Sequence, residues 1–187
     1  MAAVLNNPSA SKHWTFADLA QFGEAERYEI YDGQLIPMAP SPNAYHQRLL
    51  TRLFRLLDGF VQTHQAGEVF VAPFDVVLDE DNTAQPDLLF VAKENAGIVQ
   101  NWIFGAPDLV VEIISPSSIR RDRQDKLEQY ARFGVKEYWI IDPANHSLEI
   151  LTLENKHFTV HSMAVDKEAA ESKVLAGLSV EVAQLFS

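Results

Sequence analysis

Two apolar segments of this sequence each enclose a carboxylate, and this pattern constrains the fold more than any other feature. Residues 85–91 read Gln-Pro-Asp-Leu-Leu-Phe-Val, and residues 108–114 read Asp-Leu-Val-Val-Glu-Ile-Ile. Apolar runs of this length are typical of central, buried strands. An ionised carboxylate there is unfavourable unless a basic side chain or a metal ion lies beside it. We therefore predict that Asp87 and Glu112 lie on neighbouring strands and share a cation, with separate structural salt bridges as the alternative.

The remaining pattern predicts an α/β fold in which a mixed central β-sheet is flanked by α-helices. The clearest helix covers residues 44–63, where seven apolar side chains recur at helical spacing. A second helix is expected over residues 118–133, with Ser117 or Ser118 as its N-cap. A short helix is expected over residues 15–22.

The strands are predicted from alternating or continuous apolar runs between turn residues. Asp32-Gly33 predicts a tight hairpin, because this dipeptide suits the two-residue turns of hairpins. The expected strands cover residues 27–31, 34–38, 68–72, 74–78, 85–91, 108–114, 137–141, 148–151 and 158–160.

The size of the chain fits one domain, since 187 residues can bury a substantial core. No internal repeat or low-complexity linker divides it, so residues 14–187 are predicted to form a single domain after a flexible N-terminal arm of residues 1–13. No apolar stretch approaches the length of about 20 residues that a membrane span needs. The sequence contains no cysteine, which excludes disulfides and thiolate metal sites and is compatible with a cytoplasmic protein.

The helix expected after the second carboxylate strand carries a lysine toward its apolar side. Lys126 lies one turn before Tyr130, so it borders the packed face of that helix. A helix that returns across the sheet brings such an ammonium to the carboxylates, where it can stabilise charge on an attacked phosphate. The alternative is a surface lysine whose stem packs on apolar neighbours.

Arginines are grouped on the two predicted main helices. The net charge of −11 opposes general nucleic-acid binding, so a DNA-binding function requires a local basic face. These arginines are the candidates for that face, and a solvated surface stripe is the alternative. They are Arg48, Arg52 and Arg55 on the first helix, and Arg120 and Arg121 on the second.

Several segments in this order resemble a large, mostly uncharacterised bacterial family described as restriction endonucleases of the PD-(D/E)XK superfamily. The most specific part runs from Pro107 to Pro143, and the resemblance extends from Trp14 to Phe186. The segments are Tyr-Glu-Ile-Tyr-Asp-Gly, His-Gln, Gln-Pro-Asp-Leu-Leu-Phe-Val, Ala-Pro-Asp-Leu-Val-Val-Glu-Ile-Ile-Ser-Pro-Ser, Asp-Lys-Leu-Glu-Gln-Tyr and Gly-Val-Lys-Glu-Tyr-Trp-Ile-Ile-Asp-Pro.

The resemblance implies a restriction-endonuclease-like core and a metal site. Asp87 takes the Pro-Asp position and Glu112 the acidic position of the second motif. Ile114 stands where the superfamily has lysine, and Lys126 is the natural replacement. Further residues implied for the site are Glu29 and the carbonyl of Ile113 as additional metal ligands, with His46, Arg123 and Gln124 as auxiliary groups. Glu29 fits a salt bridge at a strand edge equally well, and His46 fits an ordinary polar helix start.

The function that follows from the resemblance is a metal-dependent endonuclease that hydrolyses DNA phosphodiester bonds. Mg²⁺ suits oxygen ligands and is often held by one or two carboxylates; Mn²⁺ is a possible substitute. One alternative is a nuclease fold that has lost turnover and serves as a binding module, as the missing lysine at position 114 suggests. Another is an interaction protein in which the carboxylates pair with arginines. A homodimer is expected, since two sites suit the cleavage of two strands.

Overall fold

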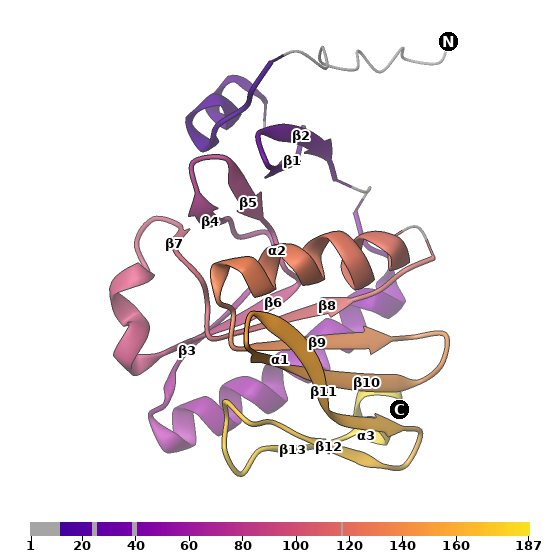
Figure 1. Ribbon diagram of the computed structural model, residues 1–187. Coiled ribbons are helices and arrows are strands. Elements are labelled where there is room, and N and C mark those ends of the chain that lie inside the picture. The colour runs from indigo at the N-terminus through magenta and orange to yellow at the C-terminus, as the bar shows by residue number, and fades with distance from the viewer. Residues whose placement is uncertain (1–11, 24–25, 39–40, 117) are drawn as a thin grey trace.

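The computed structural model describes residues 12–23, 26–38, 41–116 and 118–187, and the predicted α/β class is confirmed (Figure 1). Its strands form a six-stranded sheet in the order β11-β10-β9-β8-β6-β3, a five-stranded sheet in the order β2-β1-β5-β4-β7, and the hairpin β12-β13. The six-stranded sheet is mixed, because β8 and β9 are parallel whereas the other neighbours are antiparallel. Residues 1–11, within the predicted N-terminal arm, and Ser117, one of the two predicted helix caps, lie outside the described residues.

The six-stranded sheet forms the centre of the molecule, with one main helix on each face (Figure 1). Helix α1 covers one face, and the helix formed by the π-helical turn η3 and α2 covers the other. The elements are β3 (Gly67–Val71), β6 (Leu88–Ala92), β8 (Leu109–Ile113), β9 (Glu137–Asp142), β10 (Ser147–Glu154), β11 (His157–Val165), α1 (Ala44–His64), η3 (Arg121–Asp125) and α2 (Lys126–Phe133).

Both faces of this sheet are apolar, which explains the continuous hydrophobic runs of its strands. Leu88 and Phe90 pack with the leucines of α1, whereas Leu89 and Val91 join the cluster that contains Tyr130 of α2. Successive side chains of a strand alternate between faces. By the same alternation Val111 of β8 packs in the α1 cluster, and Glu112, the next residue, lies on the α2 face, where Val110 and Ile114 also pack.

The five-stranded sheet lies beyond α2, on the side away from the six-stranded sheet (Figure 1). The predicted hairpin is confirmed, and its turn residues Asp32 and Gly33 both have positive φ, at 47° and 71°. This is the backbone that two-residue hairpin turns require. The elements of this part are the 3₁₀ helix η1 (Phe16–Gln21), β1 (Tyr28–Tyr31), β2 (Gln34–Pro37), β4 (Val76–Asp79), β5 (Asn82–Ala84), the 3₁₀ helix η2 (Lys93–Ile98) and β7 (Ile103–Phe104).

The C-terminal segment was not predicted to have secondary structure but forms β12 (Ala169–Glu171), β13 (Ser179–Glu181) and α3 (Val182–Phe186). Its strands are three residues long and mostly exposed, so they give little periodic signal. Buried Glu137 holds this segment against the sheet: its carboxylate accepts hydrogen bonds from Ser172 Oγ at 2.6 Å, Lys173 N at 2.7 Å and Val174 N at 2.9 Å.

The predicted strand over residues 85–91 is wrong at its first residues, because β6 begins only at Leu88 and Asp87 lies in the bend before it. Pro86 has no N–H to donate to a ladder. In addition, the N–H of Ile113 donates to the side chain of Asp87, Oδ2 at 2.8 Å. Asp87 therefore replaces a backbone contact by a side-chain contact at the end of the β6–β8 ladder.

The second main helix contains a π-helical turn just before Lys126. The N–H of Lys126 donates to the carbonyl of Arg121, five residues earlier, so the carbonyl of Asp122 lacks the donor that a regular α-helix would give it. The hydroxyl of Tyr138, on β9 below, donates to this carbonyl at 2.9 Å. The π-helical turn is thus tied to the sheet at the point where the helix presents Lys126.

We expect Tyr138→Phe to lower the free energy of unfolding by about 1–2 kcal/mol, because it leaves the buried carbonyl of Asp122 without a donor. Urea unfolding followed by circular dichroism measures the change. Tyr28→Phe is the matched control, since the Tyr28 hydroxyl has no hydrogen-bond partner among the residues described, and its effect should stay within about 0.5 kcal/mol. Equal effects of the two substitutions would contradict the role given to Tyr138.

Candidate active site

Asp87 and Glu112 lie across from each other at the end of the β6–β8 ladder. The register pairs Leu88 with Val111, so the next position outward sets Asp87 opposite Glu112. Asp87 Oδ2 accepts the Ile113 N–H at 2.8 Å and lies 3.1 Å from His46 Nε2. The side chain of Asp87 is 17% exposed and that of Glu112 only 6%. Glu112 is therefore the buried member of the pair, and Asp87 is the member that lies closer to solvent.

Lys126 reaches this pair from the helix above the sheet. Its Nζ donates to Glu112 Oε1 at 2.7 Å, and the hydroxyl of Tyr130 donates to the same oxygen at 2.9 Å. Two further carboxylates lie near this ammonium, Glu29 Oε1 at 3.6 Å and Asp122 Oδ1 at 3.7 Å. The structure therefore brings Lys126 to Glu112, and it does so with a buried side chain.

Glu29 comes from β1 of the other sheet, and both of its carboxylate oxygens have protein partners. Oε2 forms an ion pair with Arg121, and Oε1 accepts the N–H of Gln85 at 2.7 Å. Glu29 is 2% exposed. It belongs to the cluster, as the sequence suggested, but it is engaged in holding Arg121 and the segment that leads to Asp87.

The charges of the cluster do not balance within it. Asp87, Glu112, Glu29 and Asp122 are four carboxylates, whereas the permanent cations among them are the two side chains of Lys126 and Arg121. When all four are ionised, the cluster carries two negative charges in excess. Such an excess in a buried site is relieved by protons or by a bound cation.

The pKa shifts follow from this crowding. Burial raises the pKa of Glu112 well above its usual value of 4.5, with Lys126 acting against it and Asp122, Asp87 and Glu29 adding to it. Burial likewise raises the pKa of Asp122. Burial alone would lower the pKa of the Lys126 ammonium, but Glu112, Glu29 and Asp122 together raise it. Lys126 is therefore a fixed positive charge, whereas burial favours the protonated forms of Glu112 and Asp122 beside it.

Each of the two central carboxylates has one oxygen left for a ligand. Asp87 Oδ1 and Glu112 Oε2 accept no hydrogen bond from the residues that the structure describes. Across those residues, no three His, Asp or Glu side chains form a complete metal-ligand set. Mg²⁺ keeps several waters and is often held by one or two carboxylates. The donor set of Asp87 and Glu112 therefore fits a hard divalent cation in which water completes the coordination.

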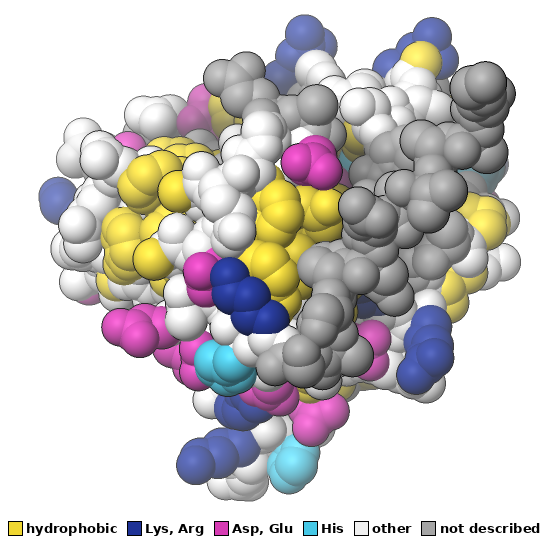
Figure 2. Space-filling view, turned by 90° about the horizontal axis from the view of Figure 1, so that it is seen from above, with side chains coloured by type: hydrophobic (Ala, Val, Ile, Leu, Met, Phe, Trp, Pro, Cys, Tyr) yellow, Lys and Arg dark blue, Asp and Glu magenta, His cyan; other side chains and the backbone are white. Residues whose placement is uncertain are grey.

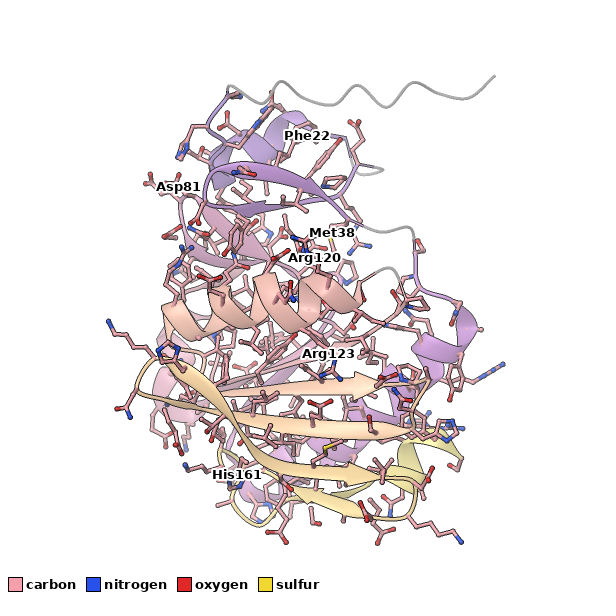
Figure 3. The ribbon with its side chains drawn as sticks, turned by 45° about the vertical axis from the view of Figure 1, so that its right-hand side comes forward. Phe22, Met38, Asp81, Arg120, Arg123 and His161 are labelled. Carbon is pink, nitrogen blue, oxygen red and sulfur yellow. The ribbon has the colours of Figure 1, made fainter. Side chains whose placement is uncertain are left out.

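The auxiliary residues named from the sequence are divided between the site and its surroundings. His46, at the start of α1, contacts Asp87, and its Nδ1 is buried without a partner. Arg123 instead pairs with Glu149 on β10, at 3.1 and 2.5 Å, and lies on the sheet side of the helix (Figure 3). Gln124 is exposed and makes no described contact with the cluster.

The five candidate phosphate-binding arginines do not form one group. Arg121 is occupied by Glu29, and Arg52 Nη1 donates to the carbonyl of Leu185 in α3 at 2.8 Å. Arg48, Arg55 and Arg120 are exposed and have no ion pair within the described ranges. Figure 2 shows the face above the N-terminal part, where the visible Lys and Arg side chains lie in small separate groups rather than in one basic area.

Sequence reasoning missed two members of the cluster. Asp122 precedes Lys126 by four residues, a spacing that places both side chains on one helix face, so its position could have been found. Tyr130 was counted as part of the apolar side, and it does pack there, but its hydroxyl also donates to Glu112. A buried tyrosine hydroxyl needs a polar partner, which was the available signal.

Comparisons with known proteins agree with this fold. A model of the Uma2 family, described as "Putative restriction endonuclease", matches residues 15–183. Among the solved structures that match is one titled as a "putative nuclease belonging to DUF820" from Anabaena variabilis, with 17% identity and a TM-score of 0.76 over 92% of this chain and 97% of that chain. No curated protein matches the sequence significantly. No helix in the described part of the chain is long and apolar enough to span a membrane. The match to the family model covers most of the chain, and the protein therefore belongs to the Uma2 family, as the sequence motifs indicated.

Proposed function

We propose that the protein is a metal-dependent endonuclease that hydrolyses phosphodiester bonds of DNA at the site formed by Asp87, Glu112 and Lys126. The observation that carries this proposal is the excess of negative charge around two carboxylates that each keep one free oxygen. Membership in a family described as restriction endonucleases supports the same reaction class.

The residues of the site have separate roles in this proposal. Asp87 and Glu112 would hold the cation, Mg²⁺ or Mn²⁺, through the oxygens that accept no hydrogen bond from the described residues. When bound, the ion supplies positive charge at the attacked phosphate and lowers the pKa of a coordinated water. His46 and the Ile113 N–H fix Asp87 by binding its other oxygen. The carbonyl of Ile113 remains a candidate oxygen ligand.

Lys126 supplies a fixed positive charge on the opposite side of Glu112. Because its ammonium lies 2.7 Å from Oε1, it favours the ionised form of Glu112 that a cation needs. A cation held by Glu112 would add to the positive charge of the Lys126 ammonium on Oε1, and together they would stabilise negative charge on a phosphate. In this role Lys126 replaces the lysine that the superfamily has two positions after Glu112.

A binding module without turnover is the second candidate, and one observation favours it. Lys126 already neutralises Glu112 through a close, buried pair, so the site is not forced to take up metal. In that case the fold would bind nucleic acid or a protein without cutting. In either case we propose a cytoplasmic homodimer built from a single domain of residues 14–187.

Two measurements on one preparation test the nuclease. Mg²⁺ at a hundred times its Kd stabilises a folded protein by about 2.7 kcal/mol, and for a chain of this size that raises Tm by about 5–10 °C. The same Mg²⁺ should allow cleavage of a supercoiled plasmid, followed on agarose gels, and EDTA should stop it. A Tm that does not respond to Mg²⁺ or Mn²⁺, with no cleavage of plasmid, linear or single-stranded DNA, would favour the module.

A further inference from the structure

Arg27 is a partly buried cation that has no ion-paired carboxylate among the described residues. Its Nη2 donates to the neutral amide of Gln85, Oε1 at 2.7 Å, and its Nε is fully buried without any partner. It forms no ion pair within the described part of the chain. Burying a charged group without a counter-ion is unfavourable, and an orphaned polar atom requires an explanation such as an absent ion or ligand.

Three arginines of the helix that crosses the sheet, unlike Arg27, have carboxylate partners. Arg121 pairs with Glu29, Arg123 with Glu149 and Arg132 with Asp32. Asp75 interacts electrostatically with Arg27, and Gln85 bridges the two side chains: its Nε2 donates to Asp75 Oδ1 at 2.6 Å and its Oε1 accepts from Arg27. Burial moreover raises the pKa of Asp75, which weakens it as a counter-charge.

The position of Arg27 connects it to the candidate active site. It precedes Glu29 by two residues, so the alternation of a strand sets both side chains on the same face. Gln85, which holds its guanidinium, also donates its backbone N–H to Glu29 and precedes Asp87 by two residues. Gln85 thus connects Arg27 both to Glu29 and to the segment that carries Asp87.

Arg27 directly precedes β1, and this end of the strand faces the start of the crossing helix. At the other end of the strand, Tyr31 lies under Arg132 in the last turn of α2. The N–H of Met38 donates to the carbonyl of Arg27 at 3.0 Å, and Figure 3 shows Met38 above Arg120 at the beginning of that helix. Arg120 is exposed there and also has no described ion pair.

We propose that Arg27 binds a backbone phosphate of the DNA that enters the site, next to the phosphate at the metal position. This inference rests on the proposed nuclease function. Arg27 was not among the five arginines that the sequence suggested as phosphate contacts. A guanidinium whose Nη2 donates to Gln85 keeps the N–H groups of Nη1 and the second N–H of Nη2, which can bind a phosphate with two parallel hydrogen bonds. The phosphate would supply the negative charge that Arg27 lacks.

Binding of a fluorescein-labelled 20-base-pair duplex, measured by anisotropy in EDTA over a series of salt concentrations, tests this contact without cleavage. Loss of one phosphate contact removes about 0.9 from the slope of log K against log salt, which is about eightfold in affinity at 0.1 M salt. We expect this change for Arg27→Gln. Arg27→Lys should keep the slope and lose only part of the affinity, because it keeps the charge but not the fork.

Arg132→Gln is the matched control, because Arg132 lies at the other end of the same strand and helix and already has Asp32 as its partner. It should leave affinity and slope unchanged. Normal binding by Arg27→Gln overturns the inference alone, while a plasmid-cleaving wild type would leave the nuclease in place. If binding depends on Arg27 but the wild type shows no Mg²⁺-dependent cleavage, the phosphate contact stands and the nuclease proposal is overturned. A wild-type protein that binds no DNA at low salt overturns the contact, and an Arg27→Gln protein that fails to fold leaves Arg27→Lys to decide.

Discussion

Asp87→Asn should lower the rate of Mg²⁺-dependent DNA cleavage at least about a thousandfold. The substitution keeps the size of the side chain and an oxygen that can still accept from Ile113 N–H and His46. It removes the charge that would hold the cation. A metal ion that stabilises charge at the phosphate contributes several kcal/mol, and about 4 kcal/mol corresponds to a factor of a thousand in rate.

The rate under single-turnover conditions is the measurement, with saturating Mg²⁺ and a nicked-circle assay. Asp125→Asn is the control, because Asp125 is exposed on the same crossing helix and has no described partner. The Tm response to Mg²⁺ should disappear in Asp87→Asn and persist in Asp125→Asn. Cleavage by Asp87→Asn at the wild-type rate would exclude Asp87 from the chemistry, whatever else the protein does.

Lys126→Met should cost about 3–5 kcal/mol of folding free energy, the second large effect. It leaves Glu112 and Glu29 buried next to Asp122 without their shared cation, and breaking a buried ion pair on one side has this magnitude. Adding Glu112→Gln should restore most of the loss, because the amide carries no charge and can still accept from Tyr130.

A double-mutant cycle, measured by urea unfolding, gives the coupling free energy between Lys126 and Glu112. We expect this coupling to be at least about 2 kcal/mol. Activity separates stability from chemistry in the same proteins: the double variant should regain stability but remain unable to cleave. If Lys126→Met unfolds with the wild-type midpoint, the buried pair does not have the electrostatic role described for it. If the double variant cleaves DNA, the site lies elsewhere.

The parts of the site that follow local sequence patterns were predictable, whereas those that depend on side chains meeting across elements were not. The apolar runs around Asp87 and Glu112 indicate buried strands, and the spacing in the helix brings Lys126 toward the sheet. The same reasoning could not foresee that the Ile113 N–H binds the side chain of Asp87 at the end of the ladder. Pro86 lacks an N–H and so signals a strand end. In the sequence this signal is weaker than the strand signal of the apolar run that follows Pro86.

The hydrophobic pattern of the sequence also could not predict that the strands divide into two main sheets. Strands such as β5, with three buried residues of mixed character, and β7, with two residues, are too short to give a periodic signal. As a result, the origin of Glu29 in a different sheet from Glu112 was not visible, and neither was its pairing with Arg121. The orphaned Arg27 became apparent only once its neighbours were known.

The π-helical turn has a consequence for the angular phase of the crossing helix. It accommodates one residue more than a regular α-helix would over the same stretch, and each residue advances a helix by about 100°. Without that extra residue, Leu127 and Tyr130 could still pack on the six-stranded sheet, but Arg121 would point away from the five-stranded sheet. The extra residue thus lets one helix contact both sheets: Arg121 in its first half binds Glu29, and Lys126 and Tyr130 in its second half bind Glu112.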